Sequence, residues 1–246
     1  NTGLFANMPW AEQCVEMIRP YLDRISFGID LNISAGSPLL DMKTVPGLVQ
    51  KNGSFLTSAM NRALDTEENH YDHVNYEEVY AEFDAQIKQF EKITGKLPDY
   101  IHGHAYGTPT TTKAMKAIAE KYDRVMSTEM LMAPGVHGCD FSYYRFGNEM
   151  NNQFRDDIKE YILEDRGHLL DAEYSWIGSH CGYIDLPLFD LSSYTIYRIK
   201  DLEAMTSPEV KDWVERNHVE LITYRELKQA VLKGLTEMNF PENIGG

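Results

Sequence analysis

The sequence predicts an α/β protein built as an open or distorted (β/α) barrel. Apolar segments of strand length alternate with helical patterns along the chain, which is typical of βα units around a parallel sheet. Chemically active residue types follow several of these segments, at the strand ends where barrels carry their chemistry. No Gly-x-Gly-x-x-Gly turn is present, which disfavours a dinucleotide-binding sheet. We expect roughly six strands in βα order.

The first half of the chain should supply three of these strands and the helices between them. Pro9 suits the first position of a helix, and Gly95 suits a helix end. The Gly, Pro, Ser and Asn residues that follow Ile33 indicate a long excursion near 34–75, and its acidic end should be solvated. The expected elements are strands at 4–8, 25–33 and 100–104 and helices at 9–24, 79–95 and 110–122.

The second half continues the alternation less regularly. Residues 129–152 show no periodicity that assigns an element. The apolar spacing elsewhere predicts strands at 124–128, 173–180 and 218–223 and helices at 152–164, 195–205, 208–217 and 225–235.

Composition excludes several classes of protein. The chain has 246 residues, of which 43% are hydrophobic and 25% charged, which suits one soluble globular domain spanning residues 1–246. Its net charge of −15 argues against binding nucleic acid or an anionic membrane. The three cysteines are widely spaced and predict no disulfide framework, so we expect a cytoplasmic protein. Because the chain opens on Asn1 and runs straight into strand-like sequence, we expect a further strand upstream.

Four residues at expected strand ends have the chemistry of a metal site. His102 and His104 are two positions apart, so a strand points both to one face. Asp30 ends the second strand and His180 ends a later one. Each has a plainer explanation: Asp30 could cap a turn, His102 and His104 could merely hydrogen-bond at a strand end or in the core, and His180 could orient its own glycine-rich loop. Together they indicate one mononuclear metal centre with an acid or base beside it.

Such a centre would suit hydrolysis of an amide. A metal held by carboxylate and imidazole activates water and polarises the carbonyl under attack. A neighbouring carboxylate would take the proton of the water, and an imidazolium such as His180 would give one to the leaving amine. The expected strand ends offer no obvious second carboxylate.

The sequence resembles the YdjC-like carbohydrate deacetylases, which include the chitooligosaccharide and hopanoid-biosynthesis-associated deacetylases. The resemblance runs nearly end to end, and the order and spacing of its blocks are more specific than any one block. Among them are Gly28-Ile-Asp-Leu-Asn32, His102-Gly-His104 and Ser179-His-Cys-Gly182. The full set covers residues 3–9, 28–36, 45–55, 82–87, 95–104, 179–185, 192–198 and 219–224.

The resemblance implies a distorted (β/α) barrel of the glycoside hydrolase/deacetylase type. It implies an enzyme that binds one divalent cation, removes N-acetyl groups from N-acetylglucosamine-type sugars and forms a homodimer. The family's ligands are an Asp from an Asp-Asp pair on the first strand and two histidines. His104 falls on one of these positions, and the Asp-Asp pair is expected upstream of Asn1.

The chain also departs from the family pattern. Asp30 replaces the other ligand histidine, which should shift the metal preference from zinc towards magnesium or manganese. His102 stands where relatives often have Asp, so we expect it to support the ligands. Cys181 stands where members usually have Pro. The remaining expected substrate-binding or supporting residues are Arg198, for which a surface salt bridge is the alternative, Asn32 and Tyr106.

Three functions therefore compete. The first is metal-dependent deacetylation of N-acetylglucosamine-type oligosaccharides or their phosphates. The second is a glycosidase acting on a disaccharide or its phosphate, which would need two carboxylates flanking the bond and no metal. The third is a sugar-binding protein that has lost catalysis, which the Asp30 and Ala105 departures would explain.

Overall fold

The computed structural model describes residues 1–147 and 149–238, and they divide into two compact units. Unit 1 comprises residues 1–130 with the C-terminal segment from Thr223, and unit 2 comprises residues 131–222. Each has a parallel sheet and its own hydrophobic core. The mixed α/β class with parallel strands is thus confirmed. Because the described strands form sheets of three and two strands, a closed barrel and a single barrel domain both stay predictions.

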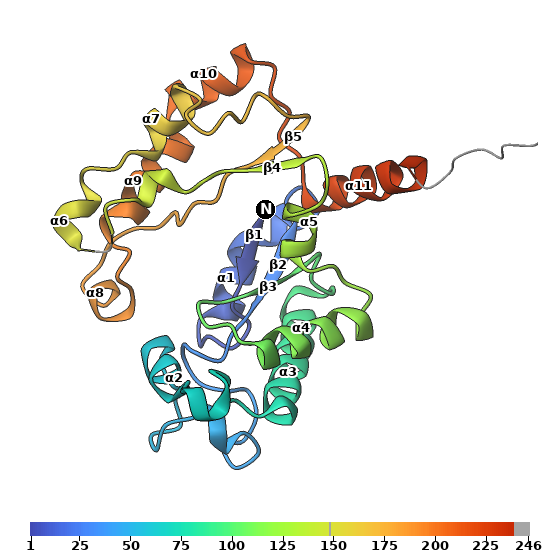
Figure 1. Ribbon diagram of the computed structural model, residues 1–246, viewed down its shortest axis with the longest axis vertical. Coiled ribbons are helices and arrows are strands. Elements are labelled where there is room, and N and C mark those ends of the chain that lie inside the picture. The colour runs from blue at the N-terminus through green and yellow to red at the C-terminus, as the bar shows by residue number, and fades with distance from the viewer. Residues whose placement is uncertain (148, 239–246) are drawn as a thin grey trace, which may run out of the picture. The chain divides into compact units, whose positions relative to one another are not determined.

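The sheet of unit 1 pairs its strands in the order β1-β2-β3, all parallel (Figure 1). Its strands are β1 (Thr2–Leu4), β2 (Phe27–Leu31) and β3 (Ile101–Gly103). Side chains alternate between the two faces of a strand. Ile29 and Leu31 therefore enter the core on one face, and Gly28 and Asp30 lie on the other. The register pairs Asp30 with His102, as expected for two strand ends that meet.

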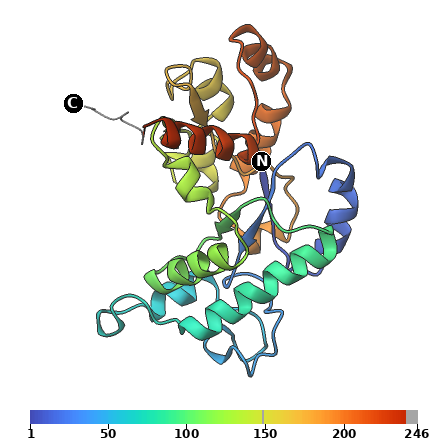
Figure 2. The same ribbon diagram turned by 90° about the vertical axis from the view of Figure 1, so that its right-hand side faces the viewer.

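Helices α3 and α4 run side by side and cover the core face of this sheet (Figure 2). Asn75 caps α3 by accepting bonds from two backbone N–H groups, and Gly95 ends the helix in the left-handed conformation, with φ of 82°. The predicted apolar stripe of α3 is buried, as its spacing indicates. The helices of unit 1 are α1 (Ala11–Ile18), α2 (Ser58–Leu64), α3 (Tyr76–Thr94), α4 (Pro109–Lys121), α5 (Ser127–Leu131) and α11 (Tyr224–Met238).

Unit 2 pairs β4 (Val136–Gly138) with β5 (Tyr174–Trp176) in parallel. Its core is rich in aromatic rings, of which Tyr143, Tyr161 and Trp213 are the largest buried members. The 3-10 turn η4 (Ser142–Tyr144) carries Tyr143 into this core. The helices are α6 (Met150–Gln153), α7 (Ile158–Leu163), α8 (Leu188–Leu191), α9 (Ile196–Thr206) and α10 (Pro208–Arg216).

Several predicted elements differ from the structure. The strand at 218–223 is wrong, because the Val219 N–H bonds to Val214 O and closes the end of α10 instead of joining a sheet. The strand at 124–128 is reduced to one bridge between Ile101 and Met126 before α5 begins. The helix at 152–164 is split, since Asp157 caps a new helix, α7. The first strand covers Thr2–Leu4, not 4–8, and β4 lies in the stretch without a prediction.

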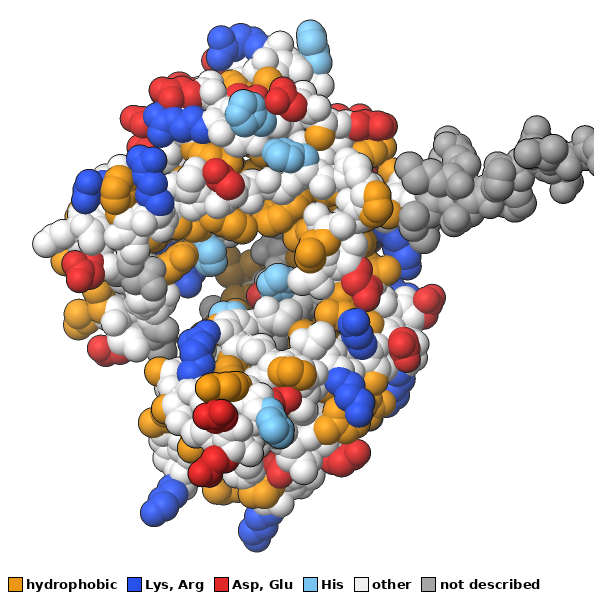
Figure 3. All heavy atoms as spheres, viewed as in Figure 1, with side chains coloured by type: hydrophobic (Ala, Val, Ile, Leu, Met, Phe, Trp, Pro, Cys, Tyr) orange, Lys and Arg blue, Asp and Glu red, His pale blue; other side chains and the backbone are white. Residues whose placement is uncertain are grey.

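Charges of both signs are mixed on the face that Figure 3 shows. Lys and Arg side chains alternate with Asp and Glu on the faces of the two units visible in Figure 3, so the net charge of −15 does not gather into one field there. Of the helices that the structure describes, none has the length and apolar character needed to cross a membrane.

Candidate active site

Asp30 is a carboxylate in an unusual environment. Its side chain lies over the backbone of Gly3, where a Cβ would come 2.1 Å from Oδ1, so only glycine leaves room for it. No residue in the described part of the chain donates a hydrogen bond to it. Burial raises the pKa of Asp30, and the charge of His102 opposes that rise. A half-buried carboxylate with no such donor is stabilised by a counter-charge, so Asp30 has the character of a cation ligand.

The two histidines occupy the neighbouring strand end. The backbone N–H of His104 donates to Leu31 O at 3.0 Å, which continues the pairing of β2 and β3 beyond their ends. The His104 ring meets Phe5 edge-on, with ring centroids 4.6 Å apart. His102 is exposed, and its Nδ1 lies 2.6 Å from Ser127 Oγ. The structure thus places Asp30, His102 and His104 at adjoining ends of β2 and β3.

These side chains supply only part of a metal site. Within residues 1–147 and 149–238, no three His, Cys, Asp or Glu side chains are grouped closely enough to hold a metal ion. Asp30 offers a carboxylate, which magnesium, manganese and zinc all accept, and His104 offers an imidazole, a donor that suits zinc. A mononuclear site usually takes at least three protein ligands, so any metal here needs one more.

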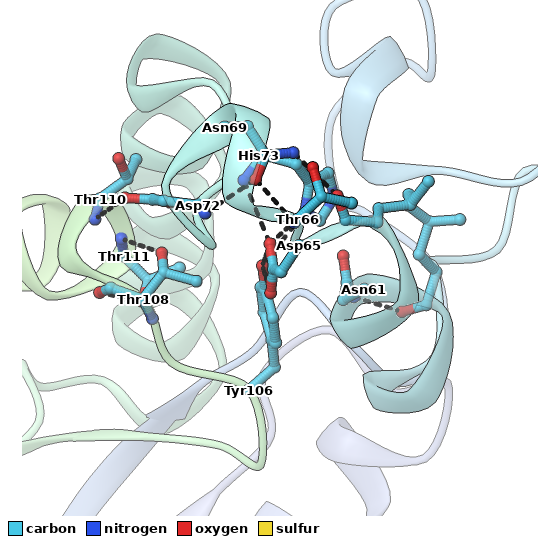
Figure 4. A network of polar contacts seen from close by, with 12 residues as sticks. Asn61, Asp65, Thr66, Asn69, Asp72, His73, Tyr106, Thr108, Thr110 and Thr111 are labelled. Atoms are coloured by element: carbon cyan, nitrogen blue, oxygen red, sulfur yellow. Dashed lines mark hydrogen bonds and ion pairs between the residues drawn. The ribbon is translucent and has the colours of Figure 1, made fainter.

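A buried polar network holds the loop that follows His104 (Figure 4). The Tyr106 hydroxyl lies 3.0 Å from both carboxylate oxygens of Asp65, to which it donates, and His73 Nδ1 lies 2.8 Å from Asp65 Oδ1. Arg62 donates to Ala105 O at 2.6 Å. Burial alone would raise the pKa of Asp65, but the hydrogen bonds from His73 and Tyr106 outweigh it and lower the pKa.

The network explains the predicted role of Tyr106 and corrects one expectation. Tyr106 is buried and reaches Asp65 with its only hydroxyl, which fits a supporting role better than contact with a substrate. Asp65 was expected to be solvated and is instead a mostly buried acceptor. Sequence reasoning missed both Asp65 and His73, because neither shows a pattern with Tyr106, which lies 41 positions after Asp65.

Asn32 is likewise a supporting residue. It is fully buried, its Oδ1 accepts from the backbone N–H groups of Ser34 and Ala35, and its Nδ2 donates to Asn7 Oδ1 and Ala35 O. Gln86 from α3 bonds both the N–H and the carbonyl of Asn32. These contacts fasten the start of the 34–75 excursion to the sheet and leave Asn32 no polar atom for a ligand.

His180 lies in unit 2, between β5 and α8. Its backbone N–H donates to Asp201 Oδ2 at 2.6 Å, and its Nδ1 lies 3.1 Å from the Tyr144 hydroxyl. Tyr144 in turn donates to Asp201 Oδ2, and the Tyr194 ring meets the imidazole edge-on with centroids 4.9 Å apart. Desolvation by the neighbouring side chains and the charge of Arg198 lower the pKa of His180, so its imidazole is neutral at neutral pH.

Arg198 bonds to Tyr194, the residue whose ring contacts His180. Its Nε donates to Tyr194 O at 2.9 Å and its Nη2 to Ser192 Oγ at 3.3 Å. No carboxylate of the described residues forms an ion pair with it, so the alternative of a surface salt bridge is not met. Tyr144 and Asp201 escaped sequence reasoning, the first in a stretch without periodicity and the second inside an ordinary helical pattern.

The family model of the YdjC-like proteins matches residues 1–216, which include β1 to β3 and most of unit 2. The chain belongs to the YdjC-like family. A "Carbohydrate deacetylase 2" of Listeria innocua is 27% identical over 92% of this chain and 87% of its own length. A "Carbohydrate deacetylase" of Enterococcus faecalis is 29% identical over the same shares of the two chains.

The fold of this YdjC-like chain is also found in a solved structure. The crystal structure of a proposed cellobiose-phosphate cleavage protein from Enterococcus faecalis matches with a TM-score of 0.69 and 24% sequence identity. The match covers 92% of this chain and 87% of that one. The sequence matches and this shared fold thus extend over most of the chain, and they support the family resemblance that the sequence blocks predict.

Proposed function

We propose that this YdjC-like protein is a carbohydrate N-deacetylase that uses one divalent cation. It would hydrolyse the acetamido group of an N-acetylglucosamine-type oligosaccharide or its phosphate, releasing acetate and a free amine. The observation that supports the proposal most is Asp30, a half-buried carboxylate whose pKa is raised by burial and which lies at the same end of the sheet as His104. The names of the similar deacetylases support the reaction class.

The proposed ligands from this chain are Asp30 and His104. When bound, a divalent cation polarises the amide carbonyl and makes water a stronger acid. His102 would orient this end of the site, because its Nδ1 is held by the buried Ser127 hydroxyl and its charge acts on Asp30. Asp30 in place of a second imidazole favours magnesium or manganese over zinc.

The proposed catalytic group is His180, which would exchange protons with the reacting atoms. Arg198 adds a positive charge beside it and would favour a substrate that carries a phosphate. The contacts that support the roles of Asp30 and His104 lie within unit 1, and those that support His180 and Arg198 lie within unit 2. Assembly as a homodimer and a cytoplasmic location stay predictions.

A glycosidase is the second candidate, and the structure favours it less. Glycosidases place two carboxylates on either side of the bond that breaks. The described strand ends of unit 1 bring one carboxylate, Asp30, together with imidazoles. A binding protein without catalysis would bind the sugar but release no product.

Acetate release tests the three alternatives. Protein stripped with a chelator would be resupplied with magnesium, manganese or zinc and incubated with N-acetylglucosamine oligomers and their phosphates. We expect acetate and free amine in equal amounts, only with metal present. Cleavage of the sugar–sugar bond without acetate would establish the glycosidase, and sugar binding with neither product would establish the binding protein.

Removing the Tyr106 hydroxyl should loosen the loop that carries His104. We expect Tyr106→Phe to destabilise the protein by about 1–2 kcal/mol, since Asp65 loses a buried donor, and to weaken metal binding by about 10–100-fold. Urea unfolding and metal titration calorimetry measure the two effects. Tyr71→Phe, at an exposed tyrosine, is the control. An unchanged metal affinity would limit Tyr106 to a role in stability.

A further inference from the structure

Two residues without a role in the proposed reaction, Tyr144 and Asp201, hold His180 from one side. Tyr144 comes from η4 and Asp201 from α9, and both are anchored in unit 2. Asp201 is 1% exposed, and its Oδ2 receives hydrogen bonds from the Tyr144 hydroxyl and the His180 backbone N–H. The carboxylate therefore fixes both the loop of His180 and the direction of the Tyr144 O–H bond.

The single proton of the Tyr144 hydroxyl decides the protonation of His180. A carboxylate accepts hydrogen bonds, so the Tyr144 hydroxyl donates its single hydrogen bond to Asp201. The hydroxyl oxygen then has only lone pairs to offer to Nδ1 of His180, 3.1 Å away. A hydrogen bond there requires a proton on Nδ1. Neutral histidine carries one ring proton, so Nε2 is left unprotonated.

We infer that Tyr144 and Asp201 are positioning residues that hold His180 as the Nδ1–H tautomer and make Nε2 its proton-exchanging atom. The inference rests on the proposed deacetylase function for its catalytic consequence. His180 then begins the reaction as a base. The sequence predicts the opposite order, in which His180 starts as an imidazolium and gives a proton to the leaving amine.

The reaction balances with His180 in both roles. Nε2 takes a proton from water as the water oxygen bonds to the acetyl carbon. The C–N bond then breaks, and its electron pair stays on nitrogen, which takes the proton back from Nε2. The products are the amino sugar and acetic acid, which ionises to acetate in water, and His180 returns to its neutral state. Throughout, Nδ1–H stays bonded to Tyr144, whose oxygen faces the positive ring.

The charged and titratable groups around the ring within unit 2 agree with this starting state. Arg198 opposes protonation of the ring, whereas the Asp201 carboxylate favours it through Tyr144. Tyr194 contacts the ring through its edge, and Cys181 follows in the chain. Desolvation by the surrounding side chains is the larger cause and the charge of Arg198 the smaller, and together they lower the pKa of His180 from its ordinary value of 6.5.

Nitrogen NMR of the full chain labelled with ¹⁵N-histidine tests the tautomer directly. The His180 signals are identified by their loss in His180→Gln. At neutral pH we expect a protonated, pyrrole-like Nδ1 and an unprotonated, pyridine-like Nε2. In Tyr144→Phe this preference should disappear, and the pKa of His180 should fall further because the imidazolium loses its acceptor. Tyr194→Phe keeps the ring contact with His180 and should leave both properties unchanged.

Kinetics give the second readout. We expect Tyr144→Phe to lower kcat on the order of 10–100-fold with little change in KM, and the acid limb of kcat/KM to move to lower pH. An Nε2–H tautomer in the wild-type protein would overturn the inference, as would a preference unaffected by Tyr144→Phe. The NMR result needs no activity, so an Nδ1–H tautomer in a protein that releases no acetate would sink the proposed function alone.

Discussion

Replacing Asp30 by alanine should abolish metal binding and with it the release of acetate. Asp30 is the only charged residue of β2 (Phe27–Leu31) and therefore its only charged metal-binding group. None of the described residues donates a hydrogen bond to this carboxylate, so it is available to a cation. A bound cation supplies several kcal/mol of charge stabilisation, so we expect a loss of activity on the order of 10³-fold or more. Metal content by atomic emission and acetate release measure the two effects.

Two further variants make this result specific. Asp23→Ala removes an exposed carboxylate near the same strand and should change neither property. Gly3→Ala keeps every donor but adds a Cβ 2.1 Å from Oδ1 of Asp30, so the carboxylate must move. We expect Gly3→Ala to weaken metal binding while the protein stays folded by circular dichroism. Full metal content and activity in Asp30→Ala would contradict the role of Asp30 as a ligand.

Replacing His180 by glutamine should slow the reaction without removing the metal. Glutamine retains a polar side chain of similar size but cannot exchange a proton, so we expect kcat to fall on the order of 10²–10⁴-fold. Metal content should remain that of the wild type. His168→Gln, at an exposed histidine of the same unit, is the matched control and should retain full activity.

The pH dependence provides an independent check on His180. In the proposed mechanism the neutral form of His180 is the active one, and its pKa is lowered from 6.5, so we expect kcat/KM to stay level at neutral pH and to fall as the pH drops through the lowered pKa. In His180→Gln this acid limb should be absent. An activity that instead falls as the pH rises through that range would mean that the imidazolium is required from the start.

The parts of the site that could be predicted are those set by the geometry of single strands. The two-residue spacing of His102 and His104 places them on one face, and parallel pairing brings Asp30 beside them. The apolar stripe of α3 and its end at Gly95 could also be predicted, because periodicity and capping act within one helix. The false strand at 218–223 had the right composition but no described neighbour to pair with.

The sequence by itself determined the α/β class, the principal helices, the family and the candidates Asp30, His104 and His180. Only the tertiary structure decided which partners these residues have. Tyr144 and His180 are 36 positions apart, and Asp65 and Tyr106 are 41 apart. Periodicity reports the face on which a side chain lies, whereas hydrogen bonds between distant segments depend on packing. The proton position on His180 and the support of the His104 loop therefore became visible only in the folded chain.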